Sequence, residues 1–120
     1  LRLVGSDTID YRYKSTDRKE LEVLYALRGN QDDVLIIRNN LLTDTSIANV
    51  ALEKEGVWYT PRTPLSKGIK RALLLERGVL TECDIPSDEI FSYSHIALFN
   101  AMIDFQSLVL EINRDTVIRT

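Results

Sequence analysis

The sequence contains few of the residues that form disulfides and metal centres. Its 120 residues include one cysteine, Cys83, and one histidine, His95. A single cysteine excludes a disulfide within the chain, and a single histidine excludes a histidine-rich metal site, so we expect no metal. Both residues lie in strand-like runs, 80–85 and 94–99, where a packed thiol and a hydrogen-bonded imidazole are the more common roles.

The chain also lacks long apolar runs and any concentration of basic residues. No segment reaches the roughly 20 apolar residues that cross a bilayer, and no signal-peptide pattern opens the sequence, so we expect a cytoplasmic protein. The net charge is −3 and charges of both signs are scattered along the chain. Without a basic stripe to neutralise phosphates, neither nucleic acid nor a membrane is an expected partner.

What the sequence does contain is the composition of an ordinary globular domain. The apolar content is 44% and the charged content 28%, and 120 residues are enough for one domain with a buried core. The first residue is Leu1 rather than methionine, and the chain opens inside a strand-like alternation. We therefore expect a piece of a longer chain, with part of any active site outside this sequence.

Hydrophobic periodicity predicts a mixed α+β fold. Turn signals at Asn39-Asn40 and Glu55-Gly56 predict hairpins, so the middle of the chain is expected to be antiparallel sheet. The predicted strands cover residues 1–4, 9–14, 34–37, 50–53, 57–59, 79–85, 96–99 and 108–112, and the run at 34–37 is expected to be covered on both faces. The predicted helices run from about residue 15 to Gly29 and over 67–77 as far as Gly78, with a helical turn over 86–90.

Residues 41–51, LLTDTSIANVA, place polar groups between two apolar, strand-like runs. A surface turn would favour glycine or proline, and this segment has neither. Two interpretations remain open. The segment is either a binding loop on a sheet, or a turn in which Asp44 and Ser46 bond only their own backbone.

Three features suggest specific chemistry. Lys14 follows a predicted strand, where its amine could enter a cavity and form a Schiff base, although a solvated edge lysine is the ordinary alternative. The Asp44 carboxylate could pair with a cationic ring nitrogen. Gly68 lies in the opening turn of a predicted helix, where free backbone N–H groups suit a phosphate.

Together, the lysine, the acidic loop with serine and asparagine, and a Gly-Ile-x-Arg helix start resemble the class IV aminotransferases. These are the pyridoxal-phosphate enzymes of the D-amino-acid and branched-chain aminotransferase fold, and they include aminodeoxychorismate lyase. The resemblance extends over about residues 13–103 and includes the motif KSTDR at 14–18. It implies that residues 1–120 form a single cofactor-binding C-terminal domain, mostly antiparallel sheet flanked by helices. The family's N-terminal domain, which supplies an arginine to the phosphate, is not visible.

The resemblance implies roles for the residues of the first two features. Lys14 would hold pyridoxal 5'-phosphate through its Schiff base and later move the proton at the substrate's alpha carbon. Asp44 would pair with the pyridine nitrogen, and Ser46 and Asn49 match the small and amide positions of the loop.

The resemblance also places the cofactor phosphate. Backbone groups of Gly68, Ile69 and Lys70 would bind it at the helix start. Asn100 and Ala101 match a later turn that closes the far side of the phosphate site.

This chain departs from the family pattern at three places. Asp44 stands where glutamate is usual, Val50 and Ala51 where an aromatic residue commonly follows the asparagine, and Ser66 where an aliphatic residue is typical. These departures affect substrate choice more than cofactor binding.

The resemblance implies one of two reactions on small molecules. The first transfers an amino group between an amino acid and a 2-oxo acid, and the second eliminates pyruvate from aminodeoxychorismate. It also implies a homodimer, to which the predicted strands 94–99 and 108–112 could contribute. The alternative is a family member that keeps the fold without the chemistry and serves as a structural or binding domain.

Overall fold

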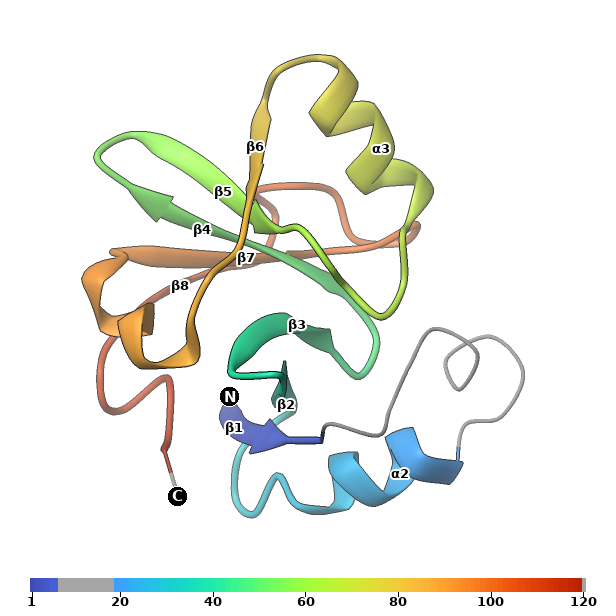
Figure 1. Cartoon of the computed structure of the whole chain (residues 1–120), viewed down its shortest axis with the longest axis vertical. Helices are drawn as coiled ribbons and strands as arrows, with labels where there is room; N and C mark the ends of the chain where they lie inside the picture. Colours follow the sequence, from blue (N-terminus) through green and yellow to red (C-terminus); the bar gives the residue numbers. More distant parts are fainter. Residues whose placement is uncertain (7–18, 120) are drawn as a thin grey trace.

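Two β-sheets and two α-helices form the part of the chain that the structure describes, which is residues 1–6 and 19–119 of a computed structural model (Figure 1). The three-stranded sheet has the order β1-β2-β3, formed by Arg2–Gly5, Val34–Arg38 and Leu41–Thr45. The five-stranded sheet has the order β6-β5-β4-β7-β8, formed by Leu80–Cys83, Val57–Pro61, Asn49–Lys54, His95–Phe99 and Val109–Glu111. The helices are α2 (Lys19–Ala26), α3 (Ile69–Glu76) and the 3-10 helix η1 (Ser87–Ser92).

Antiparallel pairing dominates the five-stranded sheet, as predicted, and the three-stranded sheet has one antiparallel and one parallel pair. Among the described strands, only the β1-β2 and β5-β6 pairs are parallel. Both predicted hairpin turns are present, and their residues have the positive φ angles that tight hairpins need: 54° and 65° at Asn39 and Asn40, and 52° and 81° at Glu55 and Gly56. Asparagine and glycine tolerate this conformation best, which is why these dipeptides predicted the turns.

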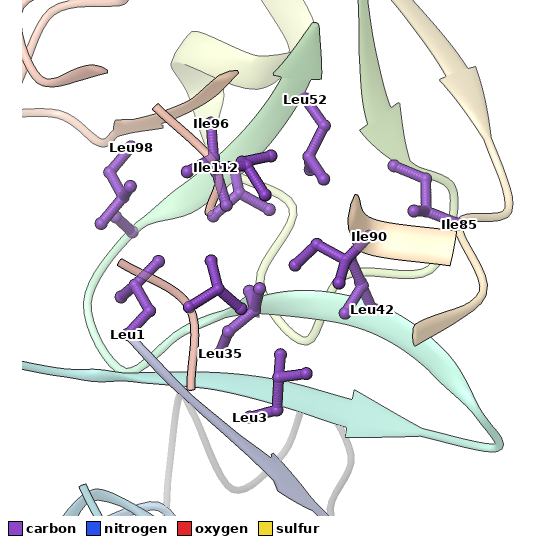
Figure 2. Packing of buried hydrophobic residues seen from close by; sticks show 13 residues of the cluster. Leu1, Leu3, Leu35, Leu42, Leu52, Ile85, Ile90, Ile96, Leu98 and Ile112 are labelled. Atoms are coloured by element: carbon purple, nitrogen blue, oxygen red, sulfur yellow. The ribbon is translucent and has the colours of Figure 1, made fainter. Parts of the chain in front are cut away.

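The main core lies between the two sheets. Leu52 of β4 faces Ile96 of β7 in the antiparallel register, so their side chains point to the same face. That face packs against Leu35 and Leu42 of the three-stranded sheet, and none of these four side chains is more than 1% exposed (Figure 2). Because the β3–β4 connection passes from one sheet to the other, the polar segment of residues 41–51 lies where the two sheets meet.

Each helix covers one outer face. Helix α2 packs Leu21 and Leu24 against Val34 and Ile36, so β2 is covered on both faces, as its continuous apolar run predicted. Helix α3 lies on the far side of the five-stranded sheet, where its leucines contact Phe99 (Figure 1). The order of layers is therefore helix, sheet, sheet, helix.

The sequence spacing of Ile69, Leu73, Leu74 and Arg77 predicts one buried face for helix α3, but of these residues only Leu74 packs against the sheet. Ile69 is 83% exposed and Leu73 is 42% exposed, whereas Arg71 is buried at 4%. The inward face combines Arg71 with Leu74 and Leu75, three and four positions further along. Periodicity alone misplaced this face because it treats an arginine as a solvent-facing residue.

The predicted boundaries also shift elsewhere. Helix α2 ends at Ala26 and not at Gly29, which lies three residues beyond it with a φ of 62°. The predicted strand at 9–14 lies outside the described residues. Neither described α-helix has the length and apolar character needed to cross a membrane.

The single histidine and the single cysteine have the structural roles expected of them. The Nδ1 atom of His95 lies 3.0 Å from Oε1 of Glu53 and 3.1 Å from Oγ of Ser94. Partial burial raises the pKa of the Cys83 thiol, against the opposing effect of a hydrogen bond with Tyr93. No group of residues suited to a metal ion occurs in the described part of the chain.

Candidate functional site

The turn between β3 and β4 is tighter than the loop that the sequence predicted. Asp44 and Thr45 belong to β3, and Asn49 opens β4, so only the three residues between them form the turn. The Thr45 hydroxyl accepts the N–H groups of Ile47 and Ala48 at 3.3 and 3.0 Å. These bonds stabilise a reversal of the chain without glycine or proline.

Asp44 is fully buried at the junction of the two sheets. Its exposed fraction is 0%, and its Oδ2 atom accepts the backbone N–H of Ser66 at 3.1 Å. The interpretation in which Asp44 bonds only its own backbone is therefore wrong, since the partner lies 22 residues further along the chain. A buried carboxylate stabilises a neighbouring positive charge strongly, because the surrounding dielectric is low.

Asn49 holds the backbone of the same residue, Ser66, through its other polar group. Its Nδ2 donates to the carbonyl oxygen of Ser66 at 2.7 Å. The backbone of Ser66 is therefore bonded to both predicted polar residues, Asp44 through its N–H and Asn49 through its C=O. This arrangement fixes the chain that enters helix α3 against the β3–β4 turn.

Gly68 is required here because there is no space for a larger residue. A Cβ atom built on Gly68 would lie 2.6 Å from Oδ1 of Asn49, closer than real Cβ contacts allow. The φ angle of Gly68 is −65°, which any residue can adopt, so the requirement is steric. Asn49 thus shapes the helix start as well as the turn.

The first turn of α3 presents free backbone donors. The N–H of Ala72 donates to the carbonyl oxygen of Gly68 at 3.1 Å, and no side chain caps the helix. The N–H groups of Ile69, Lys70 and Arg71 precede this first bond and have no acceptor within the helix. They carry the positive end of the helix dipole and suit an anion.

The turn after β7 closes on the same region. Nδ2 of Asn100 donates to the carbonyl oxygen of Ile47 at 3.1 Å, and its Oδ1 accepts the N–H of Met102 at 2.8 Å. Lys70 at the start of α3 forms an ion pair with Asp104, and the Lys70 ammonium lowers the pKa of that carboxyl. The β3–β4 turn, the α3 start and the β7–β8 connection are therefore joined by side-chain contacts.

Two of the predicted site residues, Ser46 and Ala101, lie apart from these contacts, and a third lies outside the described residues. Ser46 is buried and borders a pocket of about 270 Å³ beside α2, whose other lining residues are Leu21, Glu22, Tyr25, Asp32, Asp33 and Ile47. Ala101 is exposed, next to Asn100. Lys14 lies outside the described residues, so its approach to Asp44 stays a prediction.

The sequence interpretation missed the residues whose contacts cross between segments. In the sequence, Ser66 stands out only as a departure from the family pattern. Its bonds to Asp44 and Asn49 are made by backbone atoms, which every residue type has, so its identity does not reveal them. Asp104 forms an ion pair with Lys70, and the two residues are 34 positions apart in the sequence, so no local pattern predicts the contact. Arg71 could have been found, because it shares a helix face with two leucines and contacts Glu82.

Comparison with known proteins identifies the family of this chain. The profile of the family described as amino-transferase class IV matches residues 9–109. The chain belongs to that family. A relative in Haemophilus influenzae, an uncharacterized protein, is 40% identical over 96 residues, which is 80% of this chain and 51% of the relative.

Solved structures show the same fold. A candidate 4-amino-4-deoxychorismate lyase from Haemophilus somnus is 36% identical, with a TM-score of 0.80 over 86% of this chain and 53% of its own. The branched-chain amino acid aminotransferase from Escherichia coli is 16% identical, with a TM-score of 0.68 over 88% of this chain and 41% of its own. The class IV aminotransferase fold expected from the sequence is thereby confirmed, and the chain spans about half the length of its relatives.

We expect Gly68→Ala to lower the free energy of unfolding by about 1–3 kcal/mol, because its Cβ would collide with the Asn49 amide. Urea denaturation measures the change. Gly5→Ala is the matched control, since among the described residues its Cβ would meet only the Ile37 carbonyl oxygen, at 3.9 Å. In an Asn49→Ala background the Gly68→Ala substitution should cost less, and an equal cost in both backgrounds would contradict the proposed contact.

Proposed function

We propose that this chain is the cofactor-binding part of a pyridoxal-phosphate enzyme. The observation that supports it best is the double attachment of Ser66, which ties the buried Asp44 carboxylate to the start of helix α3. An acid for a cationic ring and an anion site for a phosphate are thus built on one stretch of backbone. A phosphorylated pyridine carries both of these groups.

The described residues fit that cofactor. Asp44 would face the pyridine nitrogen, because it is a fully buried carboxylate. The free N–H groups of Ile69 and Lys70 would hold the phosphate, with Asn100 and Ala101 completing that side through the β7–β8 connection. When bound, the cofactor supplies an electron sink for bonds at the substrate's alpha carbon. Lys14 would hold the cofactor and move a proton at that carbon.

The reaction that we favour is the elimination of pyruvate from aminodeoxychorismate to give 4-aminobenzoate. Its support is the relative of 36% identity from Haemophilus somnus, which is described as a candidate for this activity. Amino-group transfer between an amino acid and a 2-oxo acid is the second candidate, supported by the family match itself. The residues of this chain would act in the same way in both reactions. The two reactions differ in how the substrate's electrons are used.

The assembled enzyme is proposed to be a cytoplasmic homodimer. In this chain β7 is enclosed between β4 and β8, so its backbone is already paired on both sides. Strand β8 is an edge strand, and its Val109 is 38% exposed. Of the two segments expected to contribute to a dimer, residues 108–112 are therefore the accessible one.

We expect the full-length protein mixed with pyridoxal 5'-phosphate to develop a visible absorption band that Lys14→Ala abolishes. The reason is that a covalent link between the lysine and the cofactor extends the conjugated system. Lys54→Ala is the matched control. Lys54 lies at the end of β4 and contacts Tyr93, and neither residue belongs to the proposed cofactor site, so this variant should keep the band. The absence of a band in the wild-type protein would favour the non-enzymatic alternative, a structural or binding domain.

We expect the same protein to release 4-aminobenzoate and pyruvate from aminodeoxychorismate. Chromatography of the products would follow the reaction, with a parallel incubation of several amino acids with 2-oxoglutarate. New amino acids in the parallel incubation, with no 4-aminobenzoate in the first, would replace the lyase assignment by aminotransferase.

A further inference from the structure

Arg71 is a charged side chain in an unusual position. It is the third residue of α3, and only 4% of its surface is exposed. Arginine is seldom buried to this degree unless a partner compensates its charge. Arg71 belongs to the same first turn whose N–H groups are proposed to hold the phosphate.

Its partners come from two neighbouring strands of the five-stranded sheet. Nη2 of Arg71 donates to Oε2 of Glu82 at 2.6 Å and to the carbonyl oxygen of Pro61 at 3.1 Å. Glu82 lies in β6 and Pro61 ends β5, and these strands pair in parallel through Thr60 and Glu82. The guanidinium therefore links the opening turn of α3 to the end of a rigid strand pair.

The other side-chain link from this turn is weaker. Lys70 pairs with Asp104, whose side chain is 81% exposed, and an exposed ion pair contributes little to stability. Leu74 and Leu75 hold the later part of the helix against the sheet. Arg71 is therefore the buried side chain that attaches the first turn of α3, with its free N–H groups, to strands β5 and β6.

Stability does not by itself favour an arginine at this position. Burial of an ion pair removes both charges from water, and replacement of the whole pair by apolar residues of similar volume is often neutral or stabilising. The Nε–H of Arg71 also has no acceptor among the described residues, which adds to the desolvation penalty. The flanking leucines would accommodate an apolar side chain.

We propose that Arg71 is a positioning residue for phosphate binding. It fixes the first turn of α3 on the β5-β6 pair so that the N–H groups of Ile69 and Lys70 stay aimed at one point. Hydrogen bonds from a fixed donor pair depend steeply on distance and angle, so a loosened turn binds a phosphate less tightly. This inference rests on the proposed cofactor, and Arg71 itself does not contact it.

The test compares pyridoxal 5'-phosphate with pyridoxal, which lacks the phosphate, as ligands of the full-length protein. Arg71→Met should weaken binding of pyridoxal 5'-phosphate about tenfold and leave binding of pyridoxal unchanged. This variant leaves Glu82 and the Pro61 carbonyl oxygen without their partner, so it should unfold at a lower urea concentration than the wild type, whereas Arg71→Met combined with Glu82→Leu should unfold at an equal or higher one. Arg77→Met, at the exposed C-terminal end of α3, is the matched control and should change neither affinity.

Glu82→Gln is a second variant that keeps Arg71 in place. Its amide is a weaker acceptor than the carboxylate, so it should shift the affinity ratio of the two ligands in the same direction by a smaller factor. If both ligands lose affinity equally, or if neither variant changes the ratio, the inference is overturned. If the wild-type protein binds neither ligand, the proposed function fails instead.

Discussion

The backbone of Ser66 is the constraint on which the candidate site depends. Its N–H is held by the carboxylate of Asp44 and its C=O by the amide of Asn49, at 3.1 and 2.7 Å. Asp44 is the penultimate residue of β3 and Asn49 opens β4, so the Ser66 backbone is bonded to the junction of the two layers. The position of helix α3 relative to the buried acid follows from these two bonds.

The other features of the site extend this attachment. Gly68 lets the chain pass next to the Asn49 amide, and the helix then begins without a side-chain cap. Arg71 fastens the same turn to the strands beneath it. Asn100 brings the β7–β8 connection onto the β3–β4 turn. Side-chain contacts thus join three connections that are distant in sequence, and this brings the buried acid and the start of α3 onto one continuous framework.

The hairpins and the order of elements could be predicted from the sequence because their determinants are local. Asn39-Asn40 and Glu55-Gly56 favour positive φ, and the structure has them at turns. The apolar run beginning at Val34 predicted a strand buried on both faces, and α2 supplies the second cover.

The sequence failed where an interaction crosses between distant segments. Asp44 lies in strand β3, which pairs with β2, and the partner of its side chain is a backbone group 22 positions away. The buried face of α3 includes Arg71 because Glu82 compensates its charge, and no hydrophobic periodicity contains that information. The resemblance to the family assigns Asp44, Asn49 and Gly68 to one cofactor site, and only the coordinates show that Ser66 is bonded to Asp44 and Asn49 and that Gly68 lies against Asn49.

The central claim is that one rigid stretch of backbone sets the buried acid and the helix start at the spacing of a single cofactor. A crystal structure of the full-length protein with pyridoxal 5'-phosphate tests it most directly. We predict that the pyridine nitrogen lies against the Asp44 carboxylate and the phosphate against the N–H groups of Ile69 and Lys70. Density for the cofactor away from either group, in a protein that still holds Ser66 between Asp44 and Asn49, would contradict the account.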